Sequence, residues 1–259
     1  MSRFIPRFLR YLYRVPLLLL HLSLGLPMTL IAIAVPQLAT LPVGQTQRLD
    51  EWMIRWWQGG LMWIFGLRLR LVGTPLTGPA VFAANHVSWI DISVMHSQRV
   101  MGFVAKQEIA HWPLVGKLAA YGRTIFHQRG STQSFDSVLQ AMVKRLGEGW
   151  AIGIFPEGHA RSGGKIGPFH ARIFQAAVEA KVPVQPVALC YGKQGRAQAT
   201  VAFTEKESFI ANFFRLLGEP VCVTHVCFLE PIDIQTLECR RKIAELARTR
   251  ILNAIESEY

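Results

Sequence analysis

Short apolar runs bounded by turn residues constrain the fold of this chain more strongly than any other feature of its sequence. Four runs are typical of strands buried on both faces, and a fifth alternates with arginines like a half-exposed strand. The buried runs are 79–84, 100–105, 150–155 and 184–189, and the half-exposed run is 67–72. Segments typical of helices lie at 135–146, 171–180 and 236–255. This alternation predicts an α/β fold with a largely parallel central sheet flanked by helices.

Two polar clusters come directly after two of the apolar runs. The cluster 85–91 follows the run 79–84, and the cluster 156–165 follows the run 150–155. The carboxyl ends of parallel strands lie at one edge of a sheet, and ligands of open α/β sheets bind outside that edge. We therefore expect both clusters at the same edge, and the candidate site with them.

His86 and Asp91 in the first cluster are five positions apart across a predicted strand-to-helix turn. There the carboxylate can accept the Nδ1 proton of the imidazole, which leaves Nε2 free to take a proton. Backbone N–H groups near Ser88, at the predicted helix start, could bind an oxyanion. A structural alternative for Asp91 stays open, because Ser88-x-x-Asp91 resembles a capping box. The chain contains no G-x-S-x-G elbow, so the attacking group is expected to come from the substrate.

The second cluster combines a carboxylate with a glycine-rich loop. Glu157 and Gly158 follow the strand, and Arg161 and Lys165 lie in the loop. Backbone N–H groups and a guanidinium in such a loop can bind an anionic group. A nucleotide-binding Walker loop is excluded, because Ile166 replaces the required Ser or Thr.

Cysteine usage argues against a metal or a disulfide scaffold. The four cysteines form no C-x-x-C pair and lie in segments predicted to be buried, which is typical of small hydrophobic residues in a reducing compartment. Cys222, His225 and Cys227 fall on one predicted strand, and one strand rarely supplies a closed metal site. We expect neither a metal nor a cofactor.

The N-terminal third of the chain is apolar and basic. Residues 15–41 carry no Asp, Glu, Lys or Arg, and about 20 helical residues suffice to cross a membrane. A transmembrane anchor, an interfacial or re-entrant helix pair, and a signal peptide cleaved near Ala32-Ile33-Ala34 are three interpretations. Residues 52–65 contain four of the seven tryptophans, which favours an interfacial helix over a buried one. We predict a membrane-anchoring segment 1–65 and an α/β domain 66–259.

The net charge of +11 adds to the expected attraction to membranes. Each arginine near an anionic bilayer contributes about 1 kcal/mol, and the N-terminal segment holds Arg3, Arg7, Arg10 and Arg14. A non-catalytic protein that binds anionic lipid or nucleic acid is an alternative. Nucleic acid is not expected, because the basic residues are scattered rather than gathered in a stripe with aromatic residues. A secreted hydrolase is a third possibility if the signal-peptide interpretation holds.

Together these motifs resemble the glycerolipid acyltransferases, in particular the bacterial 1-acylglycerol-3-phosphate acyltransferases and their lysophospholipid relatives. The main matches are Asn85-His86-x4-Asp91, an NHx4D motif, and Phe155-Pro156-Glu157-Gly158. Weaker matches follow the family order, over about residues 66–190: Phe103-Val104-Ala105-Lys106 with Pro113 and Gly116, Gly122-x3-Phe126-x2-Arg129, and Val182-Pro183-Val184-Gln185-Pro186-Val187.

The resemblance implies an O-acyltransferase that moves an acyl chain from acyl-ACP or acyl-CoA to the free hydroxyl of a lyso-lipid. His86 would be the general base, oriented by Asp91. The expected substrate-binding residues are Asn85, Ser88, Lys106, Gly122, Arg129, Glu157, Gly158 and Arg161. Since thioester donors are cytoplasmic, we expect the enzyme on the cytoplasmic face of the inner membrane, anchored by its N-terminal segment.

The first expected acceptor is 1-acylglycerol-3-phosphate, which would give phosphatidic acid. One departure keeps a second acceptor open. The family usually reads Glu-Gly-Thr-Arg-Ser, whereas Glu157-Gly158 is followed here by His159-Ala160-Arg161, so the arginine comes one place late. A lyso-lipid without glycerol phosphate, such as a lyso-ornithine lipid, is therefore the alternative.

Overall fold

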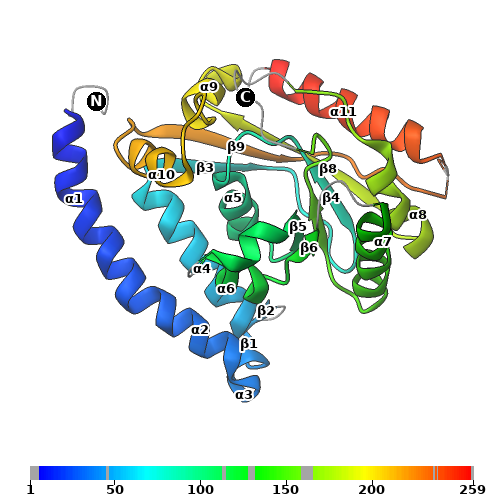
Figure 1. The fold of residues 1–259 in the computed structure, drawn as a ribbon, viewed down its shortest axis with the longest axis horizontal. Helices are drawn as coiled ribbons and strands as arrows, with labels where there is room; N and C mark the ends of the chain where they lie inside the picture. The colour runs from blue at the N-terminus through cyan, green and yellow to red at the C-terminus, as the bar shows by residue number, and fades with distance from the viewer. Residues whose placement is uncertain are drawn as a thin grey trace.

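A seven-stranded sheet forms the centre of the computed structural model (Figure 1). The structure describes residues 6–44, 47–112, 115–127, 132–158, 166–235, 237 and 239–257. The strand order is β3-β9-β8-β4-β7-β5-β6. The strands are β3 (Leu67–Val72), β4 (Val81–Ala84), β5 (Gly102–Lys106), β6 (Ile125–His127), β7 (Ile152–Ile154), β8 (Val184–Tyr191) and β9 (Cys222–Phe228). Neighbouring strands are parallel except for the antiparallel pair β8 and β9.

Helices cover both faces of this sheet, which confirms the predicted α/β sandwich (Figure 1). Side chains alternate along β4, so Phe82 and Ala84 join one core while Val81 and Ala83 join the other. The first core contains α4 (Leu49–Ile64), α5 (Ile90–Gln98) and α10 (Phe209–Leu217). The second contains α7 (Thr132–Gly147), α8 (Gln175–Ala180) and α11 (Arg240–Glu256). The other described helices after β3 are α6 (Val115–Tyr121) and α9 (Gln198–Val201), with the short turns η3 (Gln107–His111), η4 (Ala171–Phe174) and η5 (Lys193–Gly195).

Most predicted elements are present, with shifted ends. The strand predicted at 67–72 matches β3, whereas the run 184–189 continues to Tyr191 because β9 pairs with it along that length. The helix predicted at 171–180 divides into η4 and α8. The amphipathic helix α10, with exposed Ile210 and Phe214, was not predicted.

The N-terminal residues form a pair of antiparallel helices on the first core. One apolar helix of 28 residues is formed by α1 (Arg7–Leu20), the π-helical turn η2 (His21–Gly25) and α2 (Leu26–Ala34). By its length and composition this helix could cross a membrane. α3 (Pro36–Ala39), β1 (Pro42–Val43) and β2 (Gln47–Arg48) then lead into α4, which packs back along it. His21 Nε2 lies 2.8 Å from the carbonyl oxygen of Trp57, and the two rings stack.

This helix pair shares the core of the sheet. Leu18 and Leu26 are buried in the same cluster as Phe82 and Val187. Cleavage near Ala34, as the signal-peptide interpretation requires, would remove both leucines from the core. Residues 7–34 by themselves form one continuous apolar helix rather than a pair of helices, and α4 packs along it.

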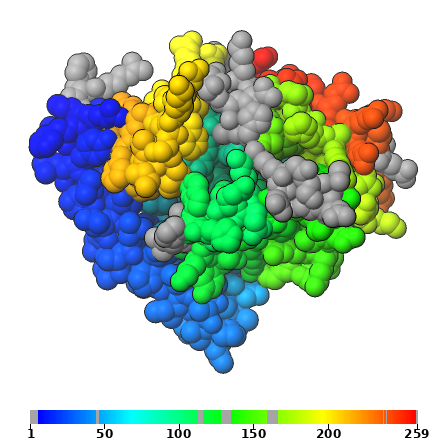
Figure 2. Space-filling model, in the orientation of Figure 1, coloured from blue at the N-terminus to red at the C-terminus, as the bar shows by residue number. Residues whose placement is uncertain are grey.

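Two of the N-terminal arginines bind the end of α10 rather than facing lipid. Arg14 is 1% exposed, and its Nη1 donates to the carbonyl oxygens of Leu217 and Glu219, each at 2.8 Å. Arg10 donates to the carbonyl of Gly218. Carbonyls at a helix C-terminus lack intrahelical partners and attract cations. The expectation that these arginines attract anionic lipid is therefore wrong for Arg10 and Arg14. Figure 2 shows α1, in blue, beside α10.

The close approach of α1 to the sheet also depends on one glycine. Gly66, between α4 and β3, has a positive φ of 81°. A Cβ at this position would collide with the guanidinium of Arg14. Glycine is therefore required here both for the backbone conformation and for the space.

Candidate active site

The candidate site lies where three adjacent strands end. β4 lies between β7 and β8 and runs parallel to both, so the three carboxyl ends share one edge of the sheet. The turn after β4 carries His86 and leads into α5, whose first turn carries Asp91. The turn after β7 carries Glu157, and β8 ends at Tyr191. This arrangement confirms that the two polar clusters, where described, belong to one edge.

His86 and Asp91 form a hydrogen-bonded pair. The distance from His86 Nδ1 to Asp91 Oδ2 is 2.8 Å. The Asp91 side chain is fully buried, whereas the His86 side chain is 18% exposed. The imidazole also stacks on Phe155, with ring centroids 4.1 Å apart. With the Nδ1 proton donated to the carboxylate, Nε2 keeps its lone pair and can accept a proton.

The Asp91 carboxylate also closes the turn, as the capping interpretation predicts. Its Oδ2 accepts the backbone N–H groups of Val87 at 2.6 Å and Ser88 at 2.9 Å. Both amides are thereby engaged with Asp91 in this structure, and oxyanion binding by backbone N–H groups near Ser88 stays a prediction. The Ser88 side chain is itself fully buried. Asp91 therefore orients His86 and caps the turn at the same time.

Tyr191 is a member of this network that was not predicted. Its hydroxyl donates to Asp91 Oδ1 at 2.5 Å. Burial, the nearby Asp91 charge and this hydrogen bond raise the pKa of Tyr191 well above its ordinary value. The phenol therefore stays neutral and acts as a donor. A tyrosine at the end of a buried run needs a partner for its hydroxyl, and this was the signal available in the sequence.

The Asn85 side chain links the end of β4 to β8. Its amide donates to the carbonyl oxygen of Leu189 at 3.0 Å and accepts the Leu189 N–H at 2.8 Å. These bonds extend the contact between β4 and β8 beyond the last residue of β4. The side chain is buried and its amide is engaged by Leu189, and the expected substrate contact of Asn85 stays a prediction.

Glu157 joins the turns after β4 and β7. Its Oε1 accepts the backbone N–H of His86 at 2.9 Å, and its Oε2 accepts that of Gly167 at 2.8 Å. The side chain is buried. Gly158 follows with a positive φ of 76°, and a Cβ there would lie 3.4 Å from the ring of His170. Glu157 thus fixes the backbone of the residue that carries the imidazole.

The other predicted substrate-binding residues lie at different distances from this network. Lys106 is exposed at the carboxyl end of β5, on the same edge of the sheet but separated from β4 by β7. Gly122 follows α6, and a Cβ there would lie 3.6 Å from Nε2 of the buried His96. Burial, and secondarily the charge of Arg123, lower the pKa of His96 to about 4. Arg129 and Arg161 lie outside the described residues.

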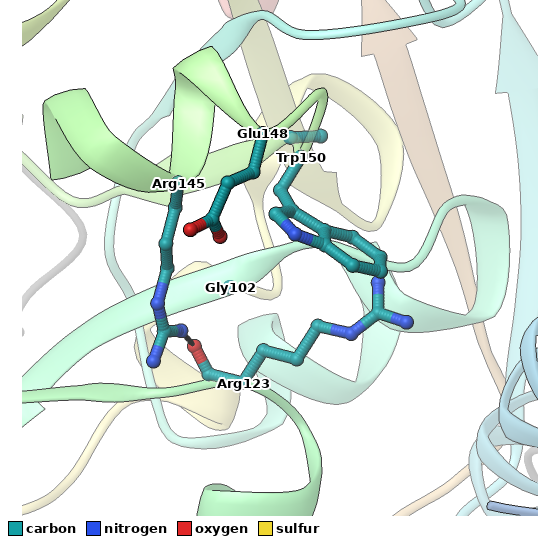
Figure 3. A pocket seen from close by; sticks show the side chains of 6 residues that line it. Gly102, Arg123, Arg145, Glu148 and Trp150 are labelled. Atoms are coloured by element: carbon teal, nitrogen blue, oxygen red, sulfur yellow. Dashed lines mark hydrogen bonds between the residues drawn. The ribbon is translucent and has the colours of Figure 1, made fainter. Parts of the chain in front are cut away.

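A cavity of about 180 Å³ lies away from this edge (Figure 3). It is lined by Gly102, Arg123, Arg145, Glu148, Trp150 and Ala151. Gly102 begins β5 and Ala151 precedes β7, so the cavity is at the amino ends of these strands. The guanidinium of Arg123 stacks over the ring of Trp150, 3.4 Å from its centroid. The cavity is thus separate from the His86 network.

Among the described residues, no group of three or more His, Cys, Asp or Glu side chains is arranged to hold a metal ion. The chemistry that the described network offers is proton transfer at His86 Nε2, supported by a buried carboxylate.

Comparisons with known proteins agree with this geometry. A family model described as Acyltransferase matches residues 69–190. The chain is 35% identical over 208 residues to a lyso-ornithine lipid O-acyltransferase of Pseudomonas aeruginosa, covering 80% of this chain and 79% of the relative. It is 32% identical over 154 residues to a 1-acyl-sn-glycerol-3-phosphate acyltransferase of Neisseria gonorrhoeae, covering 59% and 56% of the two chains.

The fold also matches a solved structure. The crystal structure of the 1-acyl-sn-glycerophosphate acyltransferase PlsC from Thermotoga maritima superposes with a TM-score of 0.71 and covers 96% of both chains. The sequence identity is 16%, so this likeness concerns the fold.

The two hydrogen bonds of Glu157 predict the effect of Glu157→Gln. One carboxylate oxygen becomes an NH₂ group that faces a backbone N–H, so one buried donor loses its acceptor. We expect the free energy of unfolding to fall by about 1–3 kcal/mol in denaturant titrations of the detergent-solubilised protein. The exposed Glu205 provides the control, because Glu205→Gln should leave stability unchanged. Equal stability of both variants would contradict the role of Glu157 as a clamp.

Proposed function

Because the chain belongs to the acyltransferase family, we propose that it transfers a fatty acyl chain from an acyl thioester to the free hydroxyl of a lyso-lipid, with His86 as the general base. The observation that carries this proposal is the 2.8 Å contact between Nδ1 of His86 and the buried carboxylate of Asp91. It leaves Nε2 as the proton acceptor on a side chain that is partly exposed.

In the proposed reaction, the acceptor hydroxyl donates a hydrogen bond to His86 Nε2. As its oxygen attacks the thioester carbonyl carbon, the proton moves to Nε2, and Asp91 stabilises the imidazolium. The tetrahedral intermediate then collapses, the carbon–sulfur bond breaks, and the leaving thiolate takes the proton from the imidazolium. The products are the acylated lipid and a free thiol. General-base catalysis of this kind contributes about 10²–10⁴-fold to the rate.

For the acceptor, we propose a lyso-ornithine lipid first and 1-acylglycerol-3-phosphate second. The match to the lyso-ornithine lipid acyltransferase of Pseudomonas aeruginosa extends over 80% of this chain, against 59% for the Neisseria relative, and this reverses the order expected from the motifs. The displaced Arg161 supports the same order, because a phosphate-binding arginine is expected one position earlier. Arg129, Arg161 and Lys106 remain proposed contacts for an anionic headgroup. Either acyl-ACP or acyl-CoA can supply the thioester.

Membrane association is proposed from an exposed apolar surface, here called the lipid face. Exposed apolar side chains lie on α1, α2, α4 and α10, and Figure 2 shows α1 beside α10. The members are Phe8, Leu12, Leu19, Leu20, Leu24, Met28, Ile31, Trp52, Trp56, Trp63, Ile210 and Phe214. Large exposed apolar surfaces mark interaction sites, and tryptophans favour the membrane interface. The lipid face would keep the enzyme at the bilayer that holds its acceptor, and cytoplasmic donors favour the cytoplasmic side.

The proposed base predicts that His86→Ala folds normally and loses acyl transfer. We expect the rate to fall by about 10²–10⁴-fold, because no other group is proposed to take the hydroxyl proton. The assay uses the detergent-solubilised full chain, labelled acyl-ACP or acyl-CoA, and a panel of lyso-lipids whose products are resolved by mass. His111→Ala, at an exposed histidine, is the control and should keep full activity.

The wild-type protein in the same assay tests the acceptor. We expect the highest kcat/KM with lyso-ornithine lipid. A preference for 1-acylglycerol-3-phosphate would select the second acceptor, and transfer to no lyso-lipid would contradict the proposed function. Retained turnover by His86→Ala would contradict the role of His86 alone.

The lipid face predicts that position 210 contacts acyl chains, since Ile210 is 66% exposed on α10. A fluorophore attached to Ile210→Cys should be quenched by brominated lipids in vesicles that contain the bound protein. The exposed Cys239 and the half-buried Cys222 are first replaced by serine, so that the remaining native cysteines, Cys190 and Cys227, are buried and the label goes to the chosen position. The matched control is Glu245→Cys on the exposed side of α11, whose label should not be quenched. Equal quenching at both positions would contradict the assignment of α10 to the lipid face.

A further inference from the structure

Tyr191 is the last residue of β8, and its fully buried hydroxyl group contacts the carboxylate that holds the proposed base. The hydrogen bond to Asp91 Oδ1 is 2.5 Å long and joins residues 100 positions apart. This hydrogen bond links Tyr191 to Asp91 and not to His86, and the Tyr191 side chain is buried away from solvent. Its effect on the reaction is therefore expected to pass through Asp91.

The sheet places Tyr191 there by letting β8 extend past β4. β4 ends at Ala84, which pairs with Val187, whereas β8 continues to Tyr191. The extension is supported from the other side by β9, where Thr224 pairs with Tyr191. The Asn85 amide also holds Leu189 within it. The end of β8 consequently lies beside the first turn of α5, which contains Asp91.

The two oxygens of Asp91 have different donors. Oδ2 accepts hydrogen bonds from His86, Val87 and Ser88, while Oδ1 accepts the Tyr191 hydroxyl. Among the described residues, no second donor to Oδ1 is recorded. A buried carboxylate oxygen without a donor is costly, and the carboxylate can reduce that cost by rotating. Rotation would move Oδ2 away from the imidazole.

We propose that Tyr191 is a positioning residue for acyl transfer: its hydroxyl fixes the plane of the Asp91 carboxylate, and thereby holds His86 in the orientation that keeps Nε2 available as base. This inference rests on the proposed function. Tyr191 keeps its proton across the neutral range, because burial and the Asp91 charge raise its pKa. It is thus a donor at every pH at which a histidine titrates.

The same hydrogen bond sets the direction of a pH effect. Without the Tyr191 hydroxyl the carboxylate rotates and Oδ2 moves away from the ring, so the imidazolium loses part of the negative charge that stabilises it. The other titratable groups beside this network are Glu157, which accepts the His86 N–H, and Cys222 of β9 next to Tyr191. Neither is altered by changes at position 191.

Tyr191→Phe tests the proposal because it removes only the hydroxyl. We expect kcat to fall by about tenfold, corresponding to the loss of one charge-assisted hydrogen bond. KM for donor and acceptor should stay within about twofold, because Tyr191 is not placed against either substrate. The acid limb of the kcat/KM profile should move to lower pH, because the protonated ring is less stabilised once Oδ2 has moved away. Unchanged kcat and an unchanged acid limb would overturn the inference.

Thr224→Val is the matched control. It removes a buried hydroxyl from the residue that faces Tyr191 across β8 and β9, without a recorded contact to Asp91. This variant should keep the wild-type kcat and acid limb. If it reproduces the loss seen in Tyr191→Phe, the effect comes from strand packing and the inference is wrong.

His86→Ala in the same assay distinguishes a failure of the inference about Tyr191 from a failure of the proposed function. If it abolishes transfer while Tyr191→Phe behaves like the wild type, the inference about Tyr191 fails and the proposed function stands. If His86→Ala retains transfer, the proposed role of His86 fails. Assays run well below the unfolding temperature of each variant exclude loss of fold as the cause.

Discussion

The buried carboxylate of Asp91 is the interaction on which the rest of the site depends. A carboxylate removed from water must be compensated by hydrogen bonds, and here the imidazole, two turn amides and a phenol supply them. The turn supplies its donors locally, but the phenol requires that β8 lie beside β4 and extend past it. Stabilising the buried Asp91 carboxylate thus requires that β8 lie next to β4 and extend beyond its end.

A second buried carboxylate extends this constraint to the next strand. Glu157 ties the backbone of His86 to the segment after β7, through the amide of Gly167. Arg248 of α11 in turn donates to the carbonyl oxygen of Gly167 at 2.7 Å. The backbone under His86 is therefore held from several elements, while the imidazole remains partly exposed. Such fixing is the preorganisation that the proposed general-base role of His86 needs.

The sequence was sufficient for the features that depend on local spacing. His86 and Asp91 are five positions apart, and the parallel strands before them predict the edge on which they meet. Tyr191 could not be placed from its spacing, since its contact spans 100 positions and depends on β9 running antiparallel to β8. The arginines of α1 were misassigned for the same reason: the helix end that binds Arg14 lies more than 200 positions away. α10 spans only 9 residues, which is short for helical periodicity to be recognised, although Ser208 before it and Gly218 after it are typical of helix ends.

The tautomer of His86 tests the central claim most directly. Nitrogen-15 NMR of histidine-labelled, detergent-solubilised protein, assigned with His86→Gln, distinguishes a protonated Nδ1 from a protonated Nε2 in the neutral ring. Asp91 predicts that neutral His86 carries its proton on Nδ1, and that Asp91→Asn weakens this preference. A neutral ring protonated on Nε2, or a tautomer indifferent to Asp91→Asn, would contradict the account.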